Sequence, residues 1–232
     1  MKNSPVIPCN DCFTRTDSVF RHLSPEELES ISINRDSKFF KKGHTIYHEG
    51  NRINGSYCIL KGIIKIYKTG SEGKEQIIKF ATAGDIIGFR SVLSNELACT
   101  SAEVLEDSQV CYISSDTLIS LIKTNGNFSL DIIRLACKEL DEANEYLTDI
   151  AQKTVRERLA EILLKLDKTF SSDNTGFLQI TLTREDLANM VGTATESVIR
   201  LLSEFKQEKL IDLQGKKIKL LNIPSLLKIS NI

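Results

Sequence analysis

The sequence predicts an α+β chain of 232 residues in which a β-rich first half and a helical second half are joined by one long helix. Three observations carry this prediction. Eight of the twelve glycines fall between Lys42 and Phe89, a heptad pattern runs through residues 125–153, and two short helical patterns with a lysine-rich hairpin follow near the end. A chain of this length exceeds the usual size of one domain, so we expect at least two cores.

The expected boundaries follow these patterns. We place an N-terminal cysteine-containing segment at 1–30, a β-roll at 31–124, a long helix at 125–153 and a C-terminal domain at 154–232. No apolar run approaches the length of a membrane span and no export leader is evident, which predicts a cytoplasmic protein without membrane contact. No nucleophile–base pair, phosphate-cradling loop or catalytic carboxylate pair emerges, so we do not expect an enzyme.

The six cysteines are scattered, which is poor evidence for disulfides in an intracellular chain. Cys9 and Cys12 are spaced like metal ligands, although they are also compatible with a mobile tail. Cys58, Cys99 and Cys137 are interpreted as core or interface residues.

Short runs rich in Ile, Tyr, Phe and Val, separated by glycines, predict the strands of the roll. Three of these runs are 56–60, 63–67 and 76–80, the last two joined by a hairpin tip at 71–74, and the pattern continues at 110–113. A closed roll of this kind commonly holds a small ligand or serves as the body of a sensor.

The long helix carries apolar residues in steps of four and three, the rhythm of a two-stranded coiled coil. Dimerisation along this seam is the natural inference, and a polar Asn144 within it favours two strands in fixed register. The alternative is a helix packed on the roll of its own chain. The predicted seam is Ile133, Cys137, Leu140, Asn144, Leu147 and Ala151.

Two helical patterns follow in the C-terminal domain. Thr183 with Asp186 three residues later predicts a cap at the start of the first, and Gly192 permits a sharp left-handed turn at its end. Thr193 with Glu196 predicts a capping box at the start of the second. The second helix separates two faces, with Val198, Leu201, Leu202 and Phe205 on one and Glu196, Arg200 and Ser203 on the other.

A hairpin is predicted at 211–220, and the whole order is that of a winged helix-turn-helix. Between Arg200 and Ile232 seven Lys or Arg oppose three Asp or Glu, although the whole chain has a net charge of −1. Double-stranded DNA is therefore the expected partner: a carboxylate accepts from cytosine N4 and an arginine grips guanine. The alternative interpretation is a surface ion pair and solvated lysines. The predicted contacts are Thr193, Thr195, Glu196, Ser197, Ile199, Arg200, Lys206, Lys216 and Lys217.

Nearly the whole chain resembles the CRP/FNR superfamily of bacterial transcription regulators, through the stretches 42–50, 84–89 and 191–200. The resemblance implies a roll of the cyclic-nucleotide-binding type, a dimerisation helix and a winged helix-turn-helix. It also implies that Glu196 and Arg200 read the half-site. Ile199 departs from the Gly or Ser usual before the arginine, so its preference at the neighbouring base step is open, with a thymine methyl as one candidate.

The cyclic-nucleotide branch of this family binds cAMP through a Glu and an Arg-Ser pair. Here the corresponding positions are Phe89 and Cys99-Thr100, so nothing neutralises a cyclic phosphate and cAMP is not the expected effector. The effector pocket that the resemblance implies contains Gly88, Phe89, Arg90, Cys99 and Thr100.

The FNR branch, which the chain resembles more closely, carries a 4Fe-4S cluster on three N-terminal cysteines and one strand cysteine. Cys9, Cys12 and Cys111 match three of these positions, and Ser18 stands at the remaining one. Asp17, Ser18 and His22 are candidates to complete the shell. A three-ligand zinc site, or an inert buried Cys111, are the alternatives. No ligand spacing supports haem through His22, His44 or His48.

Together these observations predict a homodimeric regulator that binds a palindromic DNA site and responds to a redox, oxygen, nitric-oxide or small-molecule signal. In the resemblance, the tip at 71–74 also lies where RNA polymerase is contacted. The alternatives are a winged-helix protein-interaction module and a constitutive regulator without effector.

Overall fold

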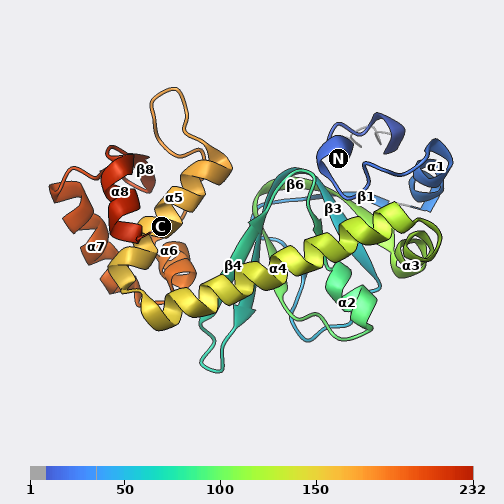
Figure 1. The fold of residues 1–232 in the computed structure, drawn as a ribbon, viewed down its shortest axis with the longest axis horizontal. Helices are drawn as coiled ribbons and strands as arrows, with labels where there is room; N and C mark the ends of the chain where they lie inside the picture. Colours follow the sequence, from blue (N-terminus) through green and yellow to red (C-terminus); the bar gives the residue numbers. More distant parts are fainter. Residues whose placement is uncertain (1–8, 35, 232) are drawn as a thin grey trace. The chain divides into compact units, whose positions relative to one another are not determined.

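The structure is a computed structural model that describes residues 9–34 and 36–231 (Figure 1). The chain divides into two compact units, 1–140 and 141–232, and each is described by itself. The division falls inside α4 (Gly126–Gln152), which forms one continuous helix as the heptad pattern predicts. The first eight residues of the N-terminal segment lie outside the described part.

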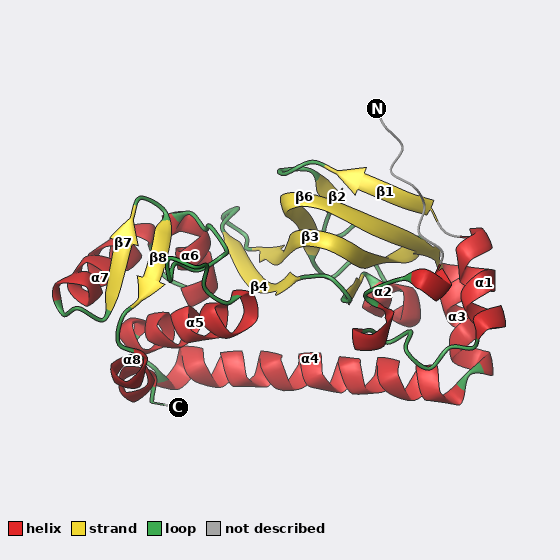
Figure 2. Ribbon diagram, turned by 90° about the horizontal axis from the view of Figure 1, so that it is seen from above, coloured by secondary structure: helices red, strands yellow, loops and turns green. Residues whose placement is uncertain are grey.

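The first unit is built on an antiparallel roll, as predicted (Figure 2). Its central strand β6 (Ser101–Ser114) pairs with β1 (Asp36–Phe40) and β2 (Thr45–Tyr47) and with the long β3 (Gly55–Thr69). The other neighbours of β3 are β4 (Glu75–Ala81) and β5 (Ile86–Ile87).

The runs 56–60 and 63–67 form one strand, β3, and the expectation of two strands was wrong. Gly62 has φ +100°, and a Cβ there would stand 2.7 Å from Ser108 Cα, so it marks a bulge where β3 crosses β6 closely. A bulge absorbs one extra residue without ending the pairing, and a glycine signal alone does not distinguish it from a turn.

Helices close one end of the roll. They are the 3-10 turns η1 (Cys9–Asp11) and η2 (Arg15–Asp17) and the α-helices α1 (Pro25–Asn34), α2 (Phe89–Ser94), α3 (Ser115–Thr124) and the first part of α4. Their apolar side chains form one core cluster with Cys58 and Cys111 of the roll, and a second cluster fills the roll itself. Cys9 and Cys12 pack against the first cluster, so the described cysteine segment is not a detached tail.

The second unit contains α5 (Val155–Phe170), α6 (Arg184–Val191), α7 (Thr195–Gln207), the hairpin β7 (Ile211–Gln214) and β8 (Lys217–Leu220), and α8 (Ile223–Ser230). The predicted cap at Thr183 is present as a full capping box with Asp186, and Gly192 ends α6 in the left-handed conformation. A further capping box, Thr154 with Glu157, begins α5.

The predicted capping box at Thr193 was wrong. Ala194 is the N-cap of α7, and it offers no side-chain acceptor to the first turn. The Thr193 N–H bonds back to the Ala188 carbonyl in the turn that ends α6, so the second helix begins one residue later than the side-chain pattern suggested.

Among the described residues, no helix combines the length and the apolar character that crossing a membrane requires.

Candidate DNA-binding surface and thiolate pocket

The recognition helix candidate α7 is anchored by one face. Val198, Leu201, Leu202 and Phe205 are buried, as the helical spacing predicts. Arg156 of α5 lies over the Phe205 ring at 4.7 Å and bonds Glu208 at the end of α7. These contacts hold the axis of the helix and leave its opposite face unconstrained by packing.

The opposite face is solvent-exposed. Glu196 is exposed and has no hydrogen-bond or ion-pair partner among the described residues. The Arg200 side chain is 71% exposed and its nearest carboxylate is Glu204, at 3.7 Å, rather than Glu196. Ile199 between them is 49% exposed. Thr195 and Ser197 are half-buried in the same turn. The opposite charges of Glu196 and Arg200, one helical turn apart, are thus exposed to solvent and make few ion pairs within the protein.

The hairpin stands beside the two helices as a wing. Lys216 and Lys217 are exposed at its tip, where Gly215 has φ +59°. Lys206 differs from the other predicted DNA contacts, because its Nζ bonds the Leu213 carbonyl at 3.1 Å and Asp212 at 2.9 Å. Its first role is therefore to tie α7 to the wing.

Arg184, which sequence reasoning missed, makes a second tie. Its Nη2 donates to the Gly215 carbonyl at 2.8 Å, joining the first turn of α6 to the wing tip. Its position directly after the predicted cap Thr183 is a usable signal, since basic residues at a helix start are otherwise disfavoured by the helix dipole.

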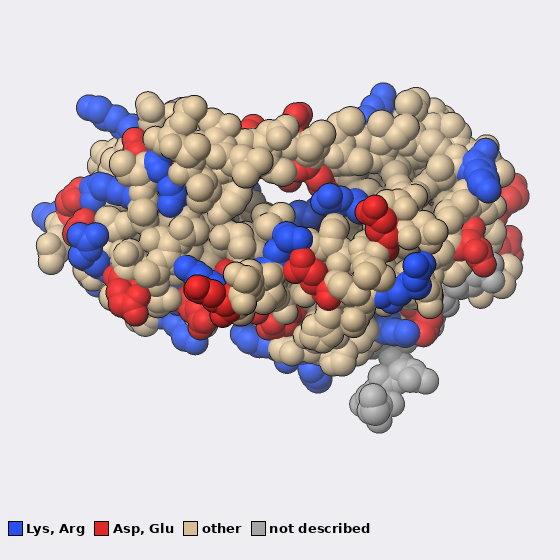
Figure 3. All heavy atoms as spheres, turned by 90° about the horizontal axis from the view of Figure 1, so that it is seen from below, with Lys and Arg blue, Asp and Glu red and all other residues tan. Residues whose placement is uncertain are grey.

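The C-terminal stretch 200–232 has an excess of basic residues, although the whole chain has a net charge of −1. On the face drawn in Figure 3, Lys and Arg side chains are intermixed with Asp and Glu rather than gathered into one continuous basic surface. Because the net charge of the whole chain is −1, contact with an anionic partner would depend on the exposed groups of α7 and the wing more than on the field of the whole molecule.

Helix α4 has one face that is buried in the first unit and one that is exposed. Phe128, Asp131 and Ile132 are buried in the first unit, and Glu139 pairs with Lys79 of β4. The predicted seam residues lie on the other side and are all exposed in the isolated chain, including Ile133 at 56%, Leu140 at 62% and Leu147 at 66%. The helix packs on its own roll without using its heptad stripe.

The residues expected around an effector differ in their exposure to solvent. Phe89 is 2% exposed and belongs to the core, whereas Arg90 is exposed with Nη1 3.8 Å from Glu139. Gly88 has φ +77° at the start of α2. The Cys99 carbonyl accepts from Lys68, and Thr100 is half-buried.

The candidate metal ligands share one pocket. Cys9, Cys12 and Cys111 all line it, and it is partly open to solvent. Cys58, expected to be a core residue, is indeed 6% exposed, yet it lines the same pocket. Burial raises the pKa of the Cys58 thiol, and the three neighbouring thiols raise it further.

Other donors are less available. Ser18 lines the pocket, but its hydroxyl donates to the Arg15 carbonyl at 2.8 Å and accepts from the Phe20 N–H at 3.2 Å. Asp17 and His22 are not among the lining residues. Among the residues that the structure describes, no three Cys, His, Asp or Glu side chains are grouped closely enough to hold one metal ion.

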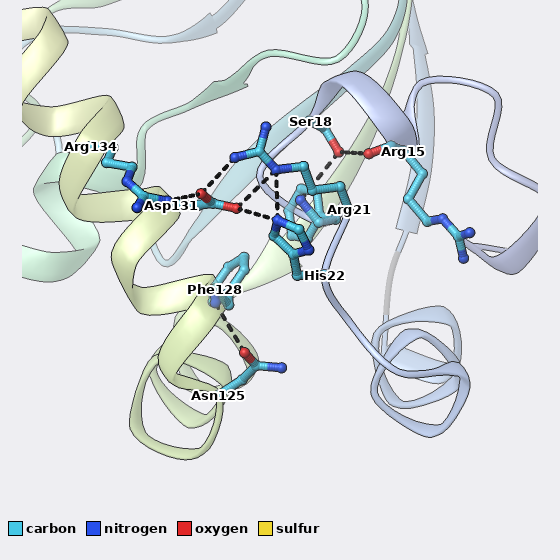
Figure 4. A network of polar contacts seen from close by, with 9 residues as sticks. Arg15, Ser18, Arg21, His22, Asn125, Phe128, Asp131 and Arg134 are labelled. Atoms are coloured by element: carbon cyan, nitrogen blue, oxygen red, sulfur yellow. Dashed lines mark hydrogen bonds and ion pairs between the residues drawn. The ribbon is translucent and has the colours of Figure 1, made fainter.

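A polar network joins the end of the cysteine segment to α4 (Figure 4). Asp131, whose side chain is 3% exposed, accepts from Arg21 at 2.7 and 3.2 Å and from Arg134 at 3.2 Å. His22 stands 3.8 Å from the same carboxylate. Burial disfavours ionisation of Asp131, but the arginine hydrogen bonds outweigh it and hold its pKa below the usual range.

Comparisons with known proteins match this arrangement. Residues 37–125 match the family described as the cyclic nucleotide-binding domain, and residues 157–229 match the Crp-like helix-turn-helix domain. The fumarate and nitrate reduction regulatory protein of Vibrio cholerae is 30% identical over 98% of this chain and 92% of its own length. The chain belongs to the CRP/FNR family of transcription regulators. It is therefore a DNA-binding regulator and not an enzyme.

Another relative of this CRP/FNR regulator is electron transport regulator A of Shewanella oneidensis, 33% identical over 92% of this chain and 86% of its own. Solved structures agree on the fold. A CRP/FNR-family transcriptional regulator described as putative, from Eubacterium rectale, has a TM-score of 0.76 at 20% identity, covering 92% of this chain and 98% of its own. FixK2 from Bradyrhizobium japonicum has a TM-score of 0.74 at 24% identity, covering 84% and 96%.

Proposed function

We propose that this CRP/FNR regulator acts in the cytoplasm as a homodimer on a palindromic DNA site and that a redox-active iron–sulfur cluster in the thiolate pocket controls it. The observation that carries the DNA part is the exposure of Glu196 and Arg200 on a helix whose other face is fully anchored. A major groove admits such a helix, and its polar turns then meet base edges.

The bases are read by complementary groups. The Glu196 carboxylate accepts a hydrogen bond from a cytosine amine, and the Arg200 guanidinium donates two to the guanine opposite. Together they favour a G·C pair in each half-site. Lys216 and Lys217 contact phosphates beside it, which adds affinity without sequence preference.

Dimerisation is supported by the exposed stripe of α4. Ile133, Leu140 and Leu147 recur at heptad spacing, and each is more than half exposed in the isolated chain. A second copy of α4 covers such a stripe by packing its side chains into the facing holes. The two-fold symmetry of that dimer places two copies of α7 on two related half-sites.

The signal enters through the cysteine segment. A pocket with several thiols suits an iron–sulfur cluster, because iron in such clusters prefers thiolate ligands. When bound, the cluster would supply a one-electron, oxygen-sensitive centre. The relatives' names, which refer to fumarate and nitrate reduction and to electron transport, agree with control by the respiratory state.

Transmission to the dimer helix follows the network of Figure 4. A change in the cysteine segment displaces Arg21, and Arg21 is hydrogen-bonded to Asp131 near the start of α4. Asp131 lies two residues before Ile133, the first seam position. The segment thereby biases how α4 presents its stripe to the second copy.

Two further proposals complete the function. The tip at 71–74, between β3 and β4, contacts RNA polymerase, as the family resemblance implies. Cyclic AMP is not the effector, because Phe89 occupies the position of the expected carboxylate and is buried in the core.

The test is DNA binding as a function of salt and sequence, measured by fluorescence anisotropy on the anaerobically prepared protein. We expect affinity for duplex DNA to fall steeply with salt as counterions are released, and a symmetric site to bind at least about a thousandfold more tightly than a scrambled one. Weak binding that ignores sequence would favour the alternative, a winged helix that binds protein.

A further inference from the structure

We propose that Cys58 supplies the fourth thiolate of an iron–sulfur site formed with Cys9, Cys12 and Cys111. It would replace the N-terminal position that Ser18 occupies in this chain. The inference rests on the proposed cluster and goes beyond it, because it names a ligand from the middle of the roll.

The strand register brings two of the thiols together. Cys58 of β3 and Cys111 of β6 are directly opposite each other in the antiparallel ladder. Residues in that relation point their side chains to the same face of the sheet, with Cβ atoms about 5 Å apart. Both side chains enter the core cluster at the end of the roll, at 6% and 4% exposure. The sheet therefore presents a pair of thiols rather than one.

The other two thiols arrive on a short anchored turn. Cys9 begins η1, and its N–H donates to Ser32 Oγ of α1 at 3.0 Å. The Cys12 N–H donates to the Cys9 carbonyl at 3.3 Å, which closes the turn. Both side chains line the pocket that the strand cysteines line, so the N-terminal turn delivers two thiols and the strands β3 and β6 deliver one each.

The donor set of the pocket is dominated by sulfur. Of the described residues that line it, none is Asp, Glu or His. Ser18 is committed to two backbone hydrogen bonds, and its withdrawal would leave the buried Phe20 N–H unsatisfied. The Cys58 sulfur makes no hydrogen bond to another described residue. Cys58, which also packs in the core cluster, is thus the remaining soft donor that lines the pocket.

Four thiols in one pocket suit a cluster, because the iron atoms of such clusters take thiolate ligands. The described residues contain no group of three or more Cys, His, Asp or Glu placed to hold one metal ion. One zinc draws its four sulfurs to about 2.3 Å from a common centre. A cluster binds each thiolate through a different iron atom, so its ligands stand farther apart. Cys9, Cys12, Cys58 and Cys111 would hold the cluster as thiolates, each after releasing its proton to solvent.

The experiment is anaerobic reconstitution of the full chain with ferrous and ferric iron and sulfide, followed by iron and acid-labile sulfide analysis and visible absorbance. We expect wild type to load a cluster. Cys58→Ala and the volume-keeping Cys58→Val should each lower iron and sulfide content by about tenfold or more, because a ligand is lost. Cys99→Ser, which changes a cysteine outside the pocket, is the matched control and should load like wild type.

Circular dichroism would reveal whether changes at the buried Cys58 impair folding. Two further variants test the role of Cys58 in that case. Ser18→Ala leaves Cys58 intact and should load fully, because Ser18 is not a ligand. Ser18→Cys added to Cys58→Ala should restore the cluster by supplying a thiol at the replaced position. Loss of the cluster in folded Ser18→Ala, or full loading of a folded Cys58 variant, would overturn the assignment of Cys58.

Failure of the proposed function would look different. Wild type that takes up no iron and sulfide contradicts the cluster itself, and with it the role of Cys58. A colourless protein with one zinc per chain has the same consequence. Wild type that loads normally while the folded Cys58 variants also load contradicts the present inference alone.

Discussion

Arg200 and Glu196 are the residues that we propose to read the DNA sequence. Their exposure is a consequence of helical geometry, since Val198, Leu201 and Leu202 bury the face from which both point away. Arg200 is held only loosely, at 3.7 Å from Glu204 on the exposed side of α7. An exposed pair of this kind contributes little to stability, so the guanidinium is available to a base without a large internal loss.

We therefore expect Arg200→Ala to weaken binding to the specific site by about 1 to 3 kcal/mol and to relax discrimination at one base pair of each half-site. Thermal stability should hardly change. Lys217→Ala, at the wing tip, should weaken specific and scrambled DNA alike and reduce the salt slope by about one. Gel shifts on both duplexes measure this, and equal losses for both variants on both DNAs would contradict the division of roles.

Asp131 is the residue of α4 that accepts hydrogen bonds from Arg21 of the cysteine segment. Its pKa is lowered in the folded protein, so its contribution to stability is fully present above the usual carboxyl pKa and is lost as pH falls through the folded value. Asp131→Asn should lower the free energy of unfolding by about 2 kcal/mol near neutral pH, because hydrogen bonds to charged partners are lost at a buried site.

Urea unfolding of wild type and Asp131→Asn across pH measures this contribution. The difference between the two should shrink below about pH 4, where the unfolded carboxyl is protonated. Asp116→Asn, in the first turn of α3, serves as a control without this network. A difference that stays constant down to the lowest pH at which both fold would rule out the ion pairs as its cause.

At the level of elements, the two helices of the DNA-binding motif begin differently. Thr183 and Asp186 exchange two hydrogen bonds at the start of α6, whereas Ala194 leaves the first turn of α7 uncapped by a side chain. We expect Thr183→Ala to lower the free energy of unfolding by about 1 kcal/mol and Ala194→Ser to raise it by a few tenths to about 1 kcal/mol. Denaturant midpoints measure both changes, and effects of the same sign would contradict the observed caps.

Helix α4 gives the element-scale prediction with the largest effect. Leu147→Lys places a charge in the proposed seam, where an unpaired buried charge costs about 3 kcal/mol or more. The dimer should then dissociate on the order of a hundredfold more readily, as sedimentation would show. Glu145→Lys puts the same side chain on the outer face and should leave the dimer intact. Identical behaviour of the two variants would refute the seam.

The sequence predicted the elements wherever one face had to be buried. The faces of α7, the length of α4 and the hairpin 211–220 follow from periodicity, which burial enforces. The sequence-based prediction failed where backbone geometry sets the boundaries of an element. Gly62 forms a bulge inside β3 rather than a break between strands, and the return of the Thr193 N–H to α6 delays the start of α7. Such details depend on neighbouring strands and turns that one sequence does not display.

Long-range pairing limited the prediction of the site. Glu196 and Arg200 lie within one helix, so their common face was predictable. Cys58 and Cys111 are far apart in sequence and meet only through the register of β3 and β6, which no local pattern specifies. The same applies to Arg21 and Asp131. Contacts between residues joined by topology, rather than by helical spacing, are therefore visible only in the structure.

For the molecule as a whole, the proposed binding to a palindromic site requires that two copies present α7 together. The net charge of −1 gives no general attraction to DNA, so specific contacts must act with the local basic charge of the C-terminal stretch. A palindrome is the DNA counterpart of a two-fold dimer. Binding to a palindrome would thus need both the exposed stripe of α4, for dimerisation, and the exposed face of α7, for contact with the bases.

The most direct test is selection of the full-length, anaerobically prepared protein on a pool of randomised duplexes. We predict enrichment of a two-fold symmetric sequence whose half-sites share a G·C pair, and loss of preference at that pair when Arg200→Ala is selected in parallel. Enrichment of no sequence, or of the same sequence by wild type and Arg200→Ala, would contradict the claim that the open face of α7 reads the bases.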